Sequence, residues 1–337
     1  MRKALTVLVM LAVAAFASDP RLFVLGGDAR LMLDDYLEMW AYPGVIGDYE
    51  FVTGESETDQ NISDGWFGMT KNFGGTTFGL TINHNDYMHE FIFSPGGWGA
   101  ILSIDYGKFY NEEEIYQKEA AIGLAWGTEI ALFGDYTDLA LGVGYDKTNI
   151  DIEDVNPYYG DLNFGASVRG HQDSFFNLFP IISVGFNQGS NGDDENDYSI
   201  SNISFDLGAG HNHMIAPKTQ FVAGAFVGVT SISYGGDYED MDSQMIITVP
   251  RLSGGVEQSI GKYFILRAGA TSNTQYWSWG DTNELTTGFN TNFGVGLKWD
   301  NFILDATIAE DFLHDGPYMV GGVGNGFLGQ VAATYNF

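Results

Sequence analysis

An alternation of apolar residues with small or polar ones runs along most of this 337-residue chain, and no other feature constrains its fold as strongly. It is clearest in residues 327–337, where Phe, Gly, Val, Ala, Tyr and Phe fall on one face and Leu, Gln, Ala, Thr and Asn on the other. A period of two predicts β-strands rather than helices. With Tyr335 and Phe337 at its end, this strand is typical of the closing strand of an outer-membrane barrel, whose interfaces carry aromatic girdles. We expect these two aromatics to be the assembly signal for the barrel-assembly machinery.

Residues 1–18 have the pattern of a secretory signal peptide. Arg2 and Lys3 precede an apolar run at 5–16, and small residues close the run at 14–18. The run is too short for a transmembrane helix, and the rest of the chain has no apolar stretch of about 18 residues either. The sequence therefore predicts an exported protein that crosses a membrane with strands.

The composition favours a membrane barrel over a soluble one. Hydrophobic residues make up 45% of the chain and charged residues only 17%, where soluble domains carry about a quarter. Because the second face of each strand is small and polar rather than charged, we expect the apolar face to point outward into outer-membrane lipid. The net charge of −30 argues against nucleic acid as a partner and favours attraction of cations.

The predicted fold is all-β: a transmembrane antiparallel up-and-down β-barrel of 14–16 strands with a short N-terminal helical plug segment. Counting back from Phe337 gives sixteen candidate strands, and the shortness of the earliest ones keeps fourteen open: 48–53, 64–71, 74–82, 87–94, 97–107, 117–133, 138–146, 161–170, 176–187, 201–210, 218–233, 243–257, 262–271, 287–298, 301–309 and 327–337. With a periplasmic C-terminus, the long acidic connections all fall on the outer side. They are 54–63, 108–116, 147–160, 188–200, 234–242, 272–286 and 310–326.

Residues 19–47 lack the alternation and form a separate unit between the signal peptide (1–18) and the barrel (48–337). A short helix is predicted at 33–39, with Asp34 and Asp35 near its start, where the helix dipole favours acids. Wall side chains cannot fill a barrel of fourteen or more strands. Either this segment plugs the interior or the barrel conducts.

The same segment resembles a known family. Leu25-Gly26-Gly27, Asp34-Asp35 and Pro43-Gly44 resemble the N-terminus of FadL-like and PorV-like outer-membrane proteins, although Tyr42 and Gly44 replace the usual Asn and Ala. The resemblance implies a barrel of about fourteen strands whose N-terminal segment folds into the lumen. It also implies either gated uptake of hydrophobic molecules, as in FadL-like members, or handling of secreted cargo, as in PorV-like members. The plug or gate residues would be Leu33, Asp34, Asp35, Trp40 and Pro43.

Strand parity places five charged residues on the lumen face: Arg169, Asp206, Arg267, Lys298 and Asp305. They could line a charged constriction, as in a porin. Alternatively, they could satisfy one another as internal ion pairs.

Four further groups of residues are candidates for metal binding or catalysis. Asp193, Asp194, Glu195 and Asp197 offer hard oxygen ligands for a loop-bound Ca²⁺, although they lack the spacing of an EF-hand, and a solvated loop is the alternative. His211 and His213 could share a metal but are predicted to lie in a periplasmic turn, and His84 and His89 flank a predicted loop without a recognisable partner. His314 lies between Asp311 and Asp315 but has no matching nucleophile, so we expect no enzyme and no bound cofactor.

The leading functional hypothesis is an outer-membrane channel for a hydrophobic small molecule, gated by residues 33–43. The alternatives are a PorV-like secretion or structural barrel and a general porin that prefers cations. A pocket lined by Phe and Leu beside the plug would favour the first, a solid plug the second, and an open, water-filled lumen the third.

Overall fold

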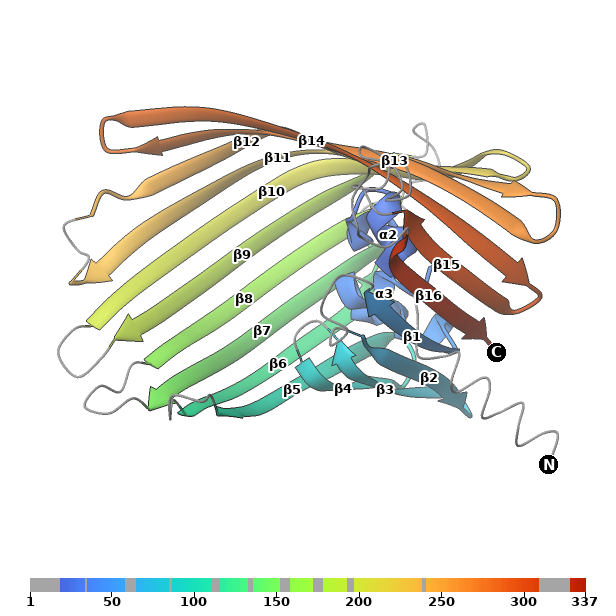
Figure 1. Cartoon of the computed structure of the whole chain (residues 1–337), viewed down its shortest axis with the longest axis horizontal. Coiled ribbons are helices and arrows are strands. Elements are labelled where there is room, and N and C mark those ends of the chain that lie inside the picture. The colour runs from blue at the N-terminus through green and yellow to red at the C-terminus, as the bar shows by residue number, and fades with distance from the viewer. Residues whose placement is uncertain are drawn as a thin grey trace, which may run out of the picture.

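The chain forms a closed barrel of sixteen antiparallel strands (Figure 1). The computed structural model describes residues 19–33, 35–57, 65–84, 87–110, 116–132, 136–151, 158–171, 178–192, 197–237, 241–308 and 328–337. The strands are β1 (Phe51–Glu57), β2 (Phe67–Phe73), β3 (Thr76–His84), β4 (Tyr87–Ser94), β5 (Trp98–Tyr110), β6 (Tyr116–Ile130), β7 (Tyr136–Asp151), β8 (Tyr158–His171), β9 (Leu178–Gly192), β10 (Asp197–Ala216), β11 (Thr219–Gly236), β12 (Gln244–Ile260), β13 (Phe264–Trp279), β14 (Thr282–Trp299), β15 (Phe302–Ile308) and β16 (Leu328–Asn336). Each strand pairs with its sequence neighbours, and β1 closes the barrel on β16. The predicted up-and-down barrel is confirmed, with sixteen strands. The predicted signal peptide, residues 1–18, lies outside the described residues.

The strands differ greatly in length. β5 to β14 contain 13 to 20 residues, whereas β1 to β4, β15 and β16 contain 7 to 9. A membrane-spanning strand needs about 9–11 residues, so the long strands continue well past the membrane on one side. Figure 1 shows them extending beyond the short strands at the end away from the C-terminus.

Several predicted connections are wrong because strand pairing continues through them. The predicted loop at 272–286 is a tight hairpin, in which β13 and β14 pair up to Trp279 opposite Thr282 and Gly280 turns with a φ of +51°. Aromatic and β-branched residues favour paired strands over loops. The predicted turn at His211 and His213 is also wrong, because both lie in β10, which runs to Ala216.

The two faces of the wall have opposite character. Outward-facing side chains are large, apolar and exposed, and include Ile122, Leu124, Val143, Phe164, Val184, Phe205, Val227, Leu266 and Phe293. The inward face of the long strands is mostly Gly, Ser and Asn. A closed barrel with an apolar outer face and a polar interior is the architecture of a bacterial outer-membrane barrel, and this protein resides in that membrane.

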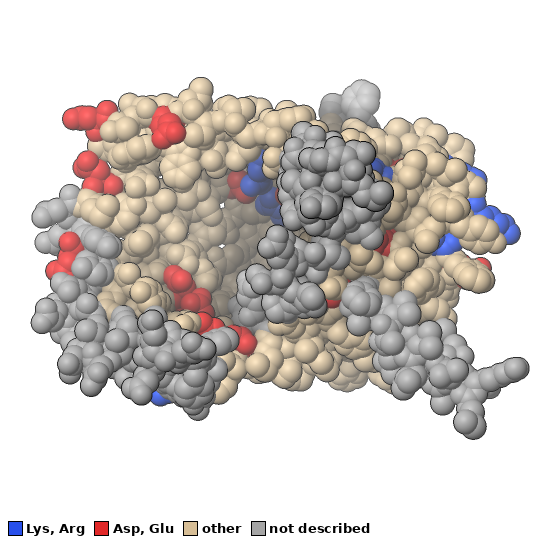
Figure 2. All heavy atoms as spheres, viewed as in Figure 1, with Lys and Arg blue, Asp and Glu red and all other residues tan. Residues whose placement is uncertain are grey.

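The charges mark the two ends of the barrel. In Figure 2, acidic side chains gather at the end where the long strands finish, and basic side chains gather at the opposite end. Lys218 and Lys262 lie in turns at that opposite end, which also holds the C-terminus. This distribution agrees with the predicted orientation, in which the acidic end faces outward. No helix among the described residues is long and apolar enough to cross a membrane.

The residues before β1 lie inside the barrel as four short helical pieces. They are α2 (Asp19–Val24), η1 (Ala29–Leu31), α3 (Glu38–Ala41) and η2 (Pro43–Asp48), and we call residues 19–50 the inner segment. The predicted helix at 33–39 is wrong, because Asp35 forms a turn and the helix that follows, α3, begins only at Glu38. The Asp35 side chain accepts a hydrogen bond from the Leu37 amide at 3.0 Å, and its carbonyl accepts one from the Glu38 amide.

Wall glycines let the inner segment approach the wall backbone to backbone. A Cβ atom at Gly269 of β13 would overlap the Val24 carbonyl, and one at Gly99 of β5 would overlap the Pro43 carbonyl. The high glycine content of the inward face is therefore required, at these positions, by close contact with the inner segment.

We expect Gly269→Leu to displace α2 while the barrel still forms. Overpacking of this kind costs about 1–3 kcal/mol, and here the obstructing atom is a backbone carbonyl of the inner segment. The measurement is trypsin cleavage after Arg21 in detergent-solubilised protein, which should become faster. Gly288→Leu is the matched control, because Gly288 also lies in the wall and a Cβ there meets nothing within 4 Å. Equal cleavage of the two variants would contradict the proposed contact.

Candidate functional site

The candidate site is the junction between the inner segment and the barrel wall. Two apolar clusters form its base. The first joins Leu25, Leu31, Met32 and Leu37 to Phe179, Ile181, Val222 and Phe226, and the second joins Met39, Val45 and Ile46 to Phe51, Ile92 and Ile101. Each fully buried side chain of this size contributes about 1.5–3 kcal/mol relative to exposure. The clusters lie on different parts of the wall, so they fix the inner segment in position and orientation.

Arg169 of β8 is the most deeply buried charge at this junction, with an exposed fraction of 0%. Its Nε donates to Asp138 Oδ2 at 2.7 Å, and its Nη1 donates to the Met32 carbonyl at 2.5 Å. It also forms an ion pair with Glu38 of α3. A buried cation needs this degree of pairing to offset its lost hydration. One wall arginine thus connects two strands to two parts of the inner segment.

Tyr42 of the inner segment completes the surroundings of Arg169. The guanidinium carbon lies 4.4 Å from the centre of the Tyr42 ring, and the Tyr42 hydroxyl is 3.1 Å from Ser167 Oγ. Burial raises the pKa of Tyr42 to about 12, although the nearby Arg169 opposes the shift. The phenol is therefore neutral at any physiological pH and acts as a hydrogen-bonding group.

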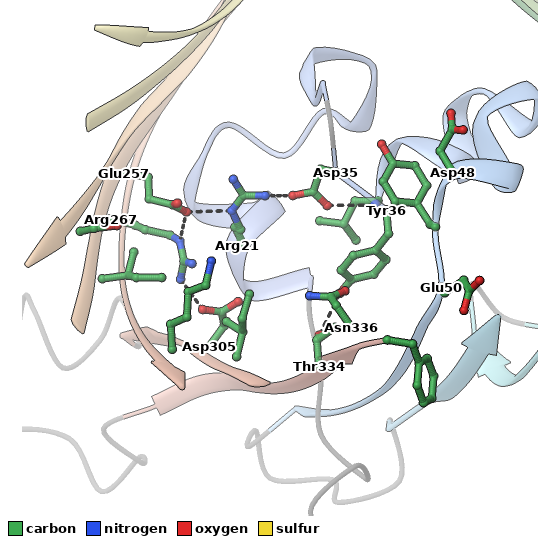
Figure 3. A pocket seen from close by; sticks show the side chains of 17 residues that line it. Arg21, Asp35, Tyr36, Asp48, Glu50, Glu257, Arg267, Asp305, Thr334 and Asn336 are labelled. Atoms are coloured by element: carbon green, nitrogen blue, oxygen red, sulfur yellow. Dashed lines mark hydrogen bonds and ion pairs between the residues drawn. The ribbon is translucent and has the colours of Figure 1, made fainter. Parts of the chain in front are cut away.

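A second network begins at Arg21 of α2 and crosses to the wall (Figure 3). Arg21 pairs with Asp35 of its own segment, and its Nε lies 2.7 Å from Glu257 Oε2 in β12. Glu257 also accepts from Arg267 Nε at 2.7 Å, and Arg267 Nη1 reaches Asp305 Oδ1 at 2.6 Å. Positive and negative groups alternate along this network of side chains, so each buried charge lies next to a group of opposite charge.

A third network surrounds Glu90 of β4, which is only 3% exposed. Its carboxylate lies 2.6 Å from His84 Nδ1 and accepts hydrogen bonds from Thr81 and Ser103 of the wall. It also accepts from the indole of Trp40 at 3.3 Å. The prediction that His84 has no recognisable partner is wrong, because β3 and β4 bring it against Glu90. Through Trp40, this group is a further attachment point of the inner segment.

Two cavities lie in the barrel, and the first borders the inner segment. One, of about 620 Å³, lies at the end that holds the C-terminus and is lined by charged groups of both signs, together with Tyr36 and Phe337. The other, of about 470 Å³, lies along the long strands and is lined mainly by Gly, Ser and Asn. In Figure 2 the barrel is visibly hollow beside the long strands.

Carboxylates lie near this second hollow. Asp146 of β7 and Asp161 of β8 are directly opposite each other, on the face away from the exposed Tyr145 and Leu162. None of the ion pairs between described residues involves either carboxylate. Two like charges placed opposite each other are unfavourable unless a cation lies near them. The hollow is therefore a region of negative potential.

The predicted site residues have different positions. Asp35, Trp40 and Pro43 belong to the inner segment at its contacts with the wall, and Leu33 packs at the edge of the first apolar cluster. Arg169, Arg267 and Asp305 face the lumen and are engaged in ion pairs rather than lining an open constriction. Asp206 lies 3.1 Å from Arg251 and 3.7 Å from Arg30, and Lys298 lines the larger cavity. Tyr335 and Phe337 stack edge to face, 5.4 Å apart, and are exposed.

Other predicted residues lie outside the described part of the chain. These are Asp34, Asp193, Asp194, Glu195, His314 and its neighbours Asp311 and Asp315, while Asp197 begins β10 without a described side chain. Among the described residues, no group of three or more His, Asp or Glu is arranged to hold a metal ion.

The sequence interpretation missed Asp138, Glu257 and Glu90. All three lie at inward positions of their strands. The same count of alternating positions that placed Arg169 on the lumen face could therefore have placed them there too. It could not reveal their distant partners, because Arg21 lies 236 positions from Glu257, Trp40 lies 50 from Glu90, and Arg169 lies 31 from Asp138.

No protein-family model and no curated protein sequence matches this chain. Among solved structures, it is similar to the β domain of the Bordetella autotransporter Brka, at 12% identity and a TM-score of 0.37, over 71% of this chain and 97% of that one. It is also similar to the translocator domain of the autotransporter NalP from Neisseria meningitidis, at 12% identity and a TM-score of 0.31, over 93% and 99%. The alcaligin outer-membrane receptor FauA from Bordetella pertussis matches at 8% identity and a TM-score of 0.38, over 77% of this chain but only 43% of that one. These TM-scores are too low to carry function to this chain, and the resemblance to FadL-like and PorV-like barrels stays a prediction.

Proposed function

We propose that this protein is a gated outer-membrane channel for small polar solutes, with a preference for cations, in which the inner segment is the gate. The observation that carries the proposal is the contrast between the two halves of the lumen. One half is filled by the inner segment, and the other is a hollow lined by Gly, Ser and Asn. A barrel of sixteen strands is wide enough to conduct once its interior is cleared.

The chemistry of the two cavities supports a polar rather than a hydrophobic solute. In the described part of the chain, the cavity at the inner segment is lined by Arg21, Asp35, Glu257, Arg267 and Asp305 rather than by Phe and Leu alone. A hydrophobic solute would have to strip water from these charges without replacing it. The hydrophobic-ligand hypothesis therefore ranks below the polar one. The carboxylates of Asp146 and Asp161, which form no ion pair with another described residue, favour cations.

A permanently closed structural barrel is the second candidate. The buried ion pairs of Arg169 and the two apolar clusters favour it, because they make displacement of the inner segment costly. The two candidates differ in one measurable property, which is whether the inner segment ever leaves its place.

A disulfide between the inner segment and the wall tests the proposal. A Cβ at Gly294 of β14 would lie 3.7 Å from the Cβ of Val24, close to the mean separation of about 3.8 Å in disulfides. The chain has no native Cys, so Val24→Cys with Gly294→Cys would form one defined bond. We expect the oxidised variant to show no openings in a planar bilayer, and reduction to restore the openings of the wild-type protein.

The controls separate the alternatives. Each single-cysteine variant should behave like the wild type with or without oxidant. If the oxidised and reduced double variants conduct equally, solutes do not pass by movement of the inner segment and the gate is refuted. If neither the wild type nor the reduced variant ever opens, the structural barrel is supported instead.

A further inference from the structure

The cavity of about 620 Å³ has charged groups on two facing sides. Figure 3 shows Glu257, Arg267 and Asp305 of the wall on one side, and Asp48 and Glu50 of the inner segment on the other. Its volume lies within the range of about 300–1,000 Å³ that is typical of small-molecule sites. The residues that line it at the C-terminal end of the barrel, Asn336 and Phe337, place its mouth on the periplasmic side.

Among the cations that line this cavity, Lys298 is the one that could bind a ligand. Arg21 and Arg267 each contact two carboxylates, whereas Lys298 takes part in no ion pair between described residues. Among the described residues, its hydrogen bond runs from its backbone amide to the Tyr263 carbonyl. An ammonium group that faces a cavity without a carboxylate partner is a binding group for an anion.

The other side of the cavity offers a carboxylate. Glu50 pairs with Lys71, but the side chains of that pair are 30% and 38% exposed. Exposed ion pairs contribute only about 0–1 kcal/mol, so a bound cation could replace Lys71 at small cost. Asp48 lines the same side and adds negative potential.

We propose that this cavity binds a small zwitterion, namely a free amino acid or a short peptide. Lys298 would hold the carboxylate of the ligand, and Glu50 with Asp48 would hold its ammonium group. Tyr36 and Phe337 also line the cavity and provide apolar surface for a side chain. This goes beyond the gated channel proposed above, because it assigns a ligand to a periplasmic site that forms while the inner segment is in place.

The test is isothermal titration calorimetry on the full-length protein in detergent, with the dipeptide alanyl-alanine as the probe. Two matched ligands each remove one charge: N-acetyl-alanyl-alanine and alanyl-alanine amide. We expect the dipeptide to bind at least tenfold more tightly than either one. Lys298→Gln and Glu50→Gln should each weaken its binding about tenfold, which corresponds to the loss of about 1.4 kcal/mol.

Lys262→Gln is the control variant, because Lys262 is an exposed lysine in the nearby β12–β13 turn but does not line the cavity. It should bind the dipeptide like the wild type. The proposal is overturned if the dipeptide gives no binding heat, if either singly charged ligand binds as tightly, or if Lys298→Gln leaves the affinity unchanged. None of these outcomes depends on conduction, so they are independent of the test of the gate.

Discussion

Removing residues 19–47 is expected to convert this protein from a mostly closed barrel into an open pore. The deletion clears one half of the lumen, and the wall of sixteen strands remains. Natural barrels with 16–18 strands enclose an aqueous channel when nothing plugs them, so single-channel currents in a planar bilayer should increase by roughly an order of magnitude or more. Circular dichroism and heat-modifiable migration in gels should show that the variant is still a folded barrel.

The open pore should prefer cations, and the preference should depend on two wall carboxylates. Asp146 and Asp161 lie opposite each other, and no described cation pairs with them. In the deletion background, Asp146→Asn with Asp161→Asn should therefore shift the reversal potential in a salt gradient toward the non-selective value. The shift should be smaller at high salt, because the Debye length falls to about 3 Å at 1 M. An unchanged conductance after deletion would mean that the inner segment does not close the barrel.

Arg169→Met is expected to produce the largest loss of stability among single substitutions. It leaves the Glu38 carboxylate buried without a cation and leaves Asp138 with His171 alone, at exposed fractions of 4% and 1%. Removing one partner of a buried ion pair costs about 3–5 kcal/mol. Here we expect the substitution to weaken the binding of the inner segment to the wall. We expect frequent channel openings and rapid trypsin cleavage after Arg30 in the variant.

Two companion variants show whether the effect arises from unpaired charge. Arg251→Met removes a lumen arginine that is 35% exposed and pairs with Asp206 at 3.1 Å, so its effect should stay near 1 kcal/mol or below. Adding Glu38→Gln and Asp138→Asn to Arg169→Met should recover much of the lost stability, because no buried charge is then uncompensated. If Arg169→Met were no more harmful than Arg251→Met, the network would not hold the inner segment.

The barrel was predictable because its signal is local. In β7, for example, the alternation of Leu139, Leu141, Val143 and Tyr145 with small residues predicts both the strand and its outward face without knowledge of any partner. The strand ends were less predictable. Residues 272–286 were predicted to be a loop, yet pairing continues to Trp279, with Tyr276 opposite Leu285 and Trp277 opposite Glu284.

The inner segment was predictable only as a segment without alternation. Its predicted helix at 33–39 is wrong because Asp35 forms a turn before a shorter helix and at the same time pairs with Arg21. Helices this short gain too little from their own hydrogen bonds to decide their own boundaries. Tertiary packing decides them instead.

The sequence by itself determined the strand count to within two, the outward face of each strand, the acidic outer end and the membrane in which the barrel lies. These follow from a period of two and from composition, which do not depend on distant contacts. Only the tertiary structure decided what the inward charges do. Arg169 meets Glu38 across 131 positions, and Arg21 meets Glu257 across 236. Such partners are chosen when the barrel closes around the inner segment, because only then do distant inward positions face one another across the lumen.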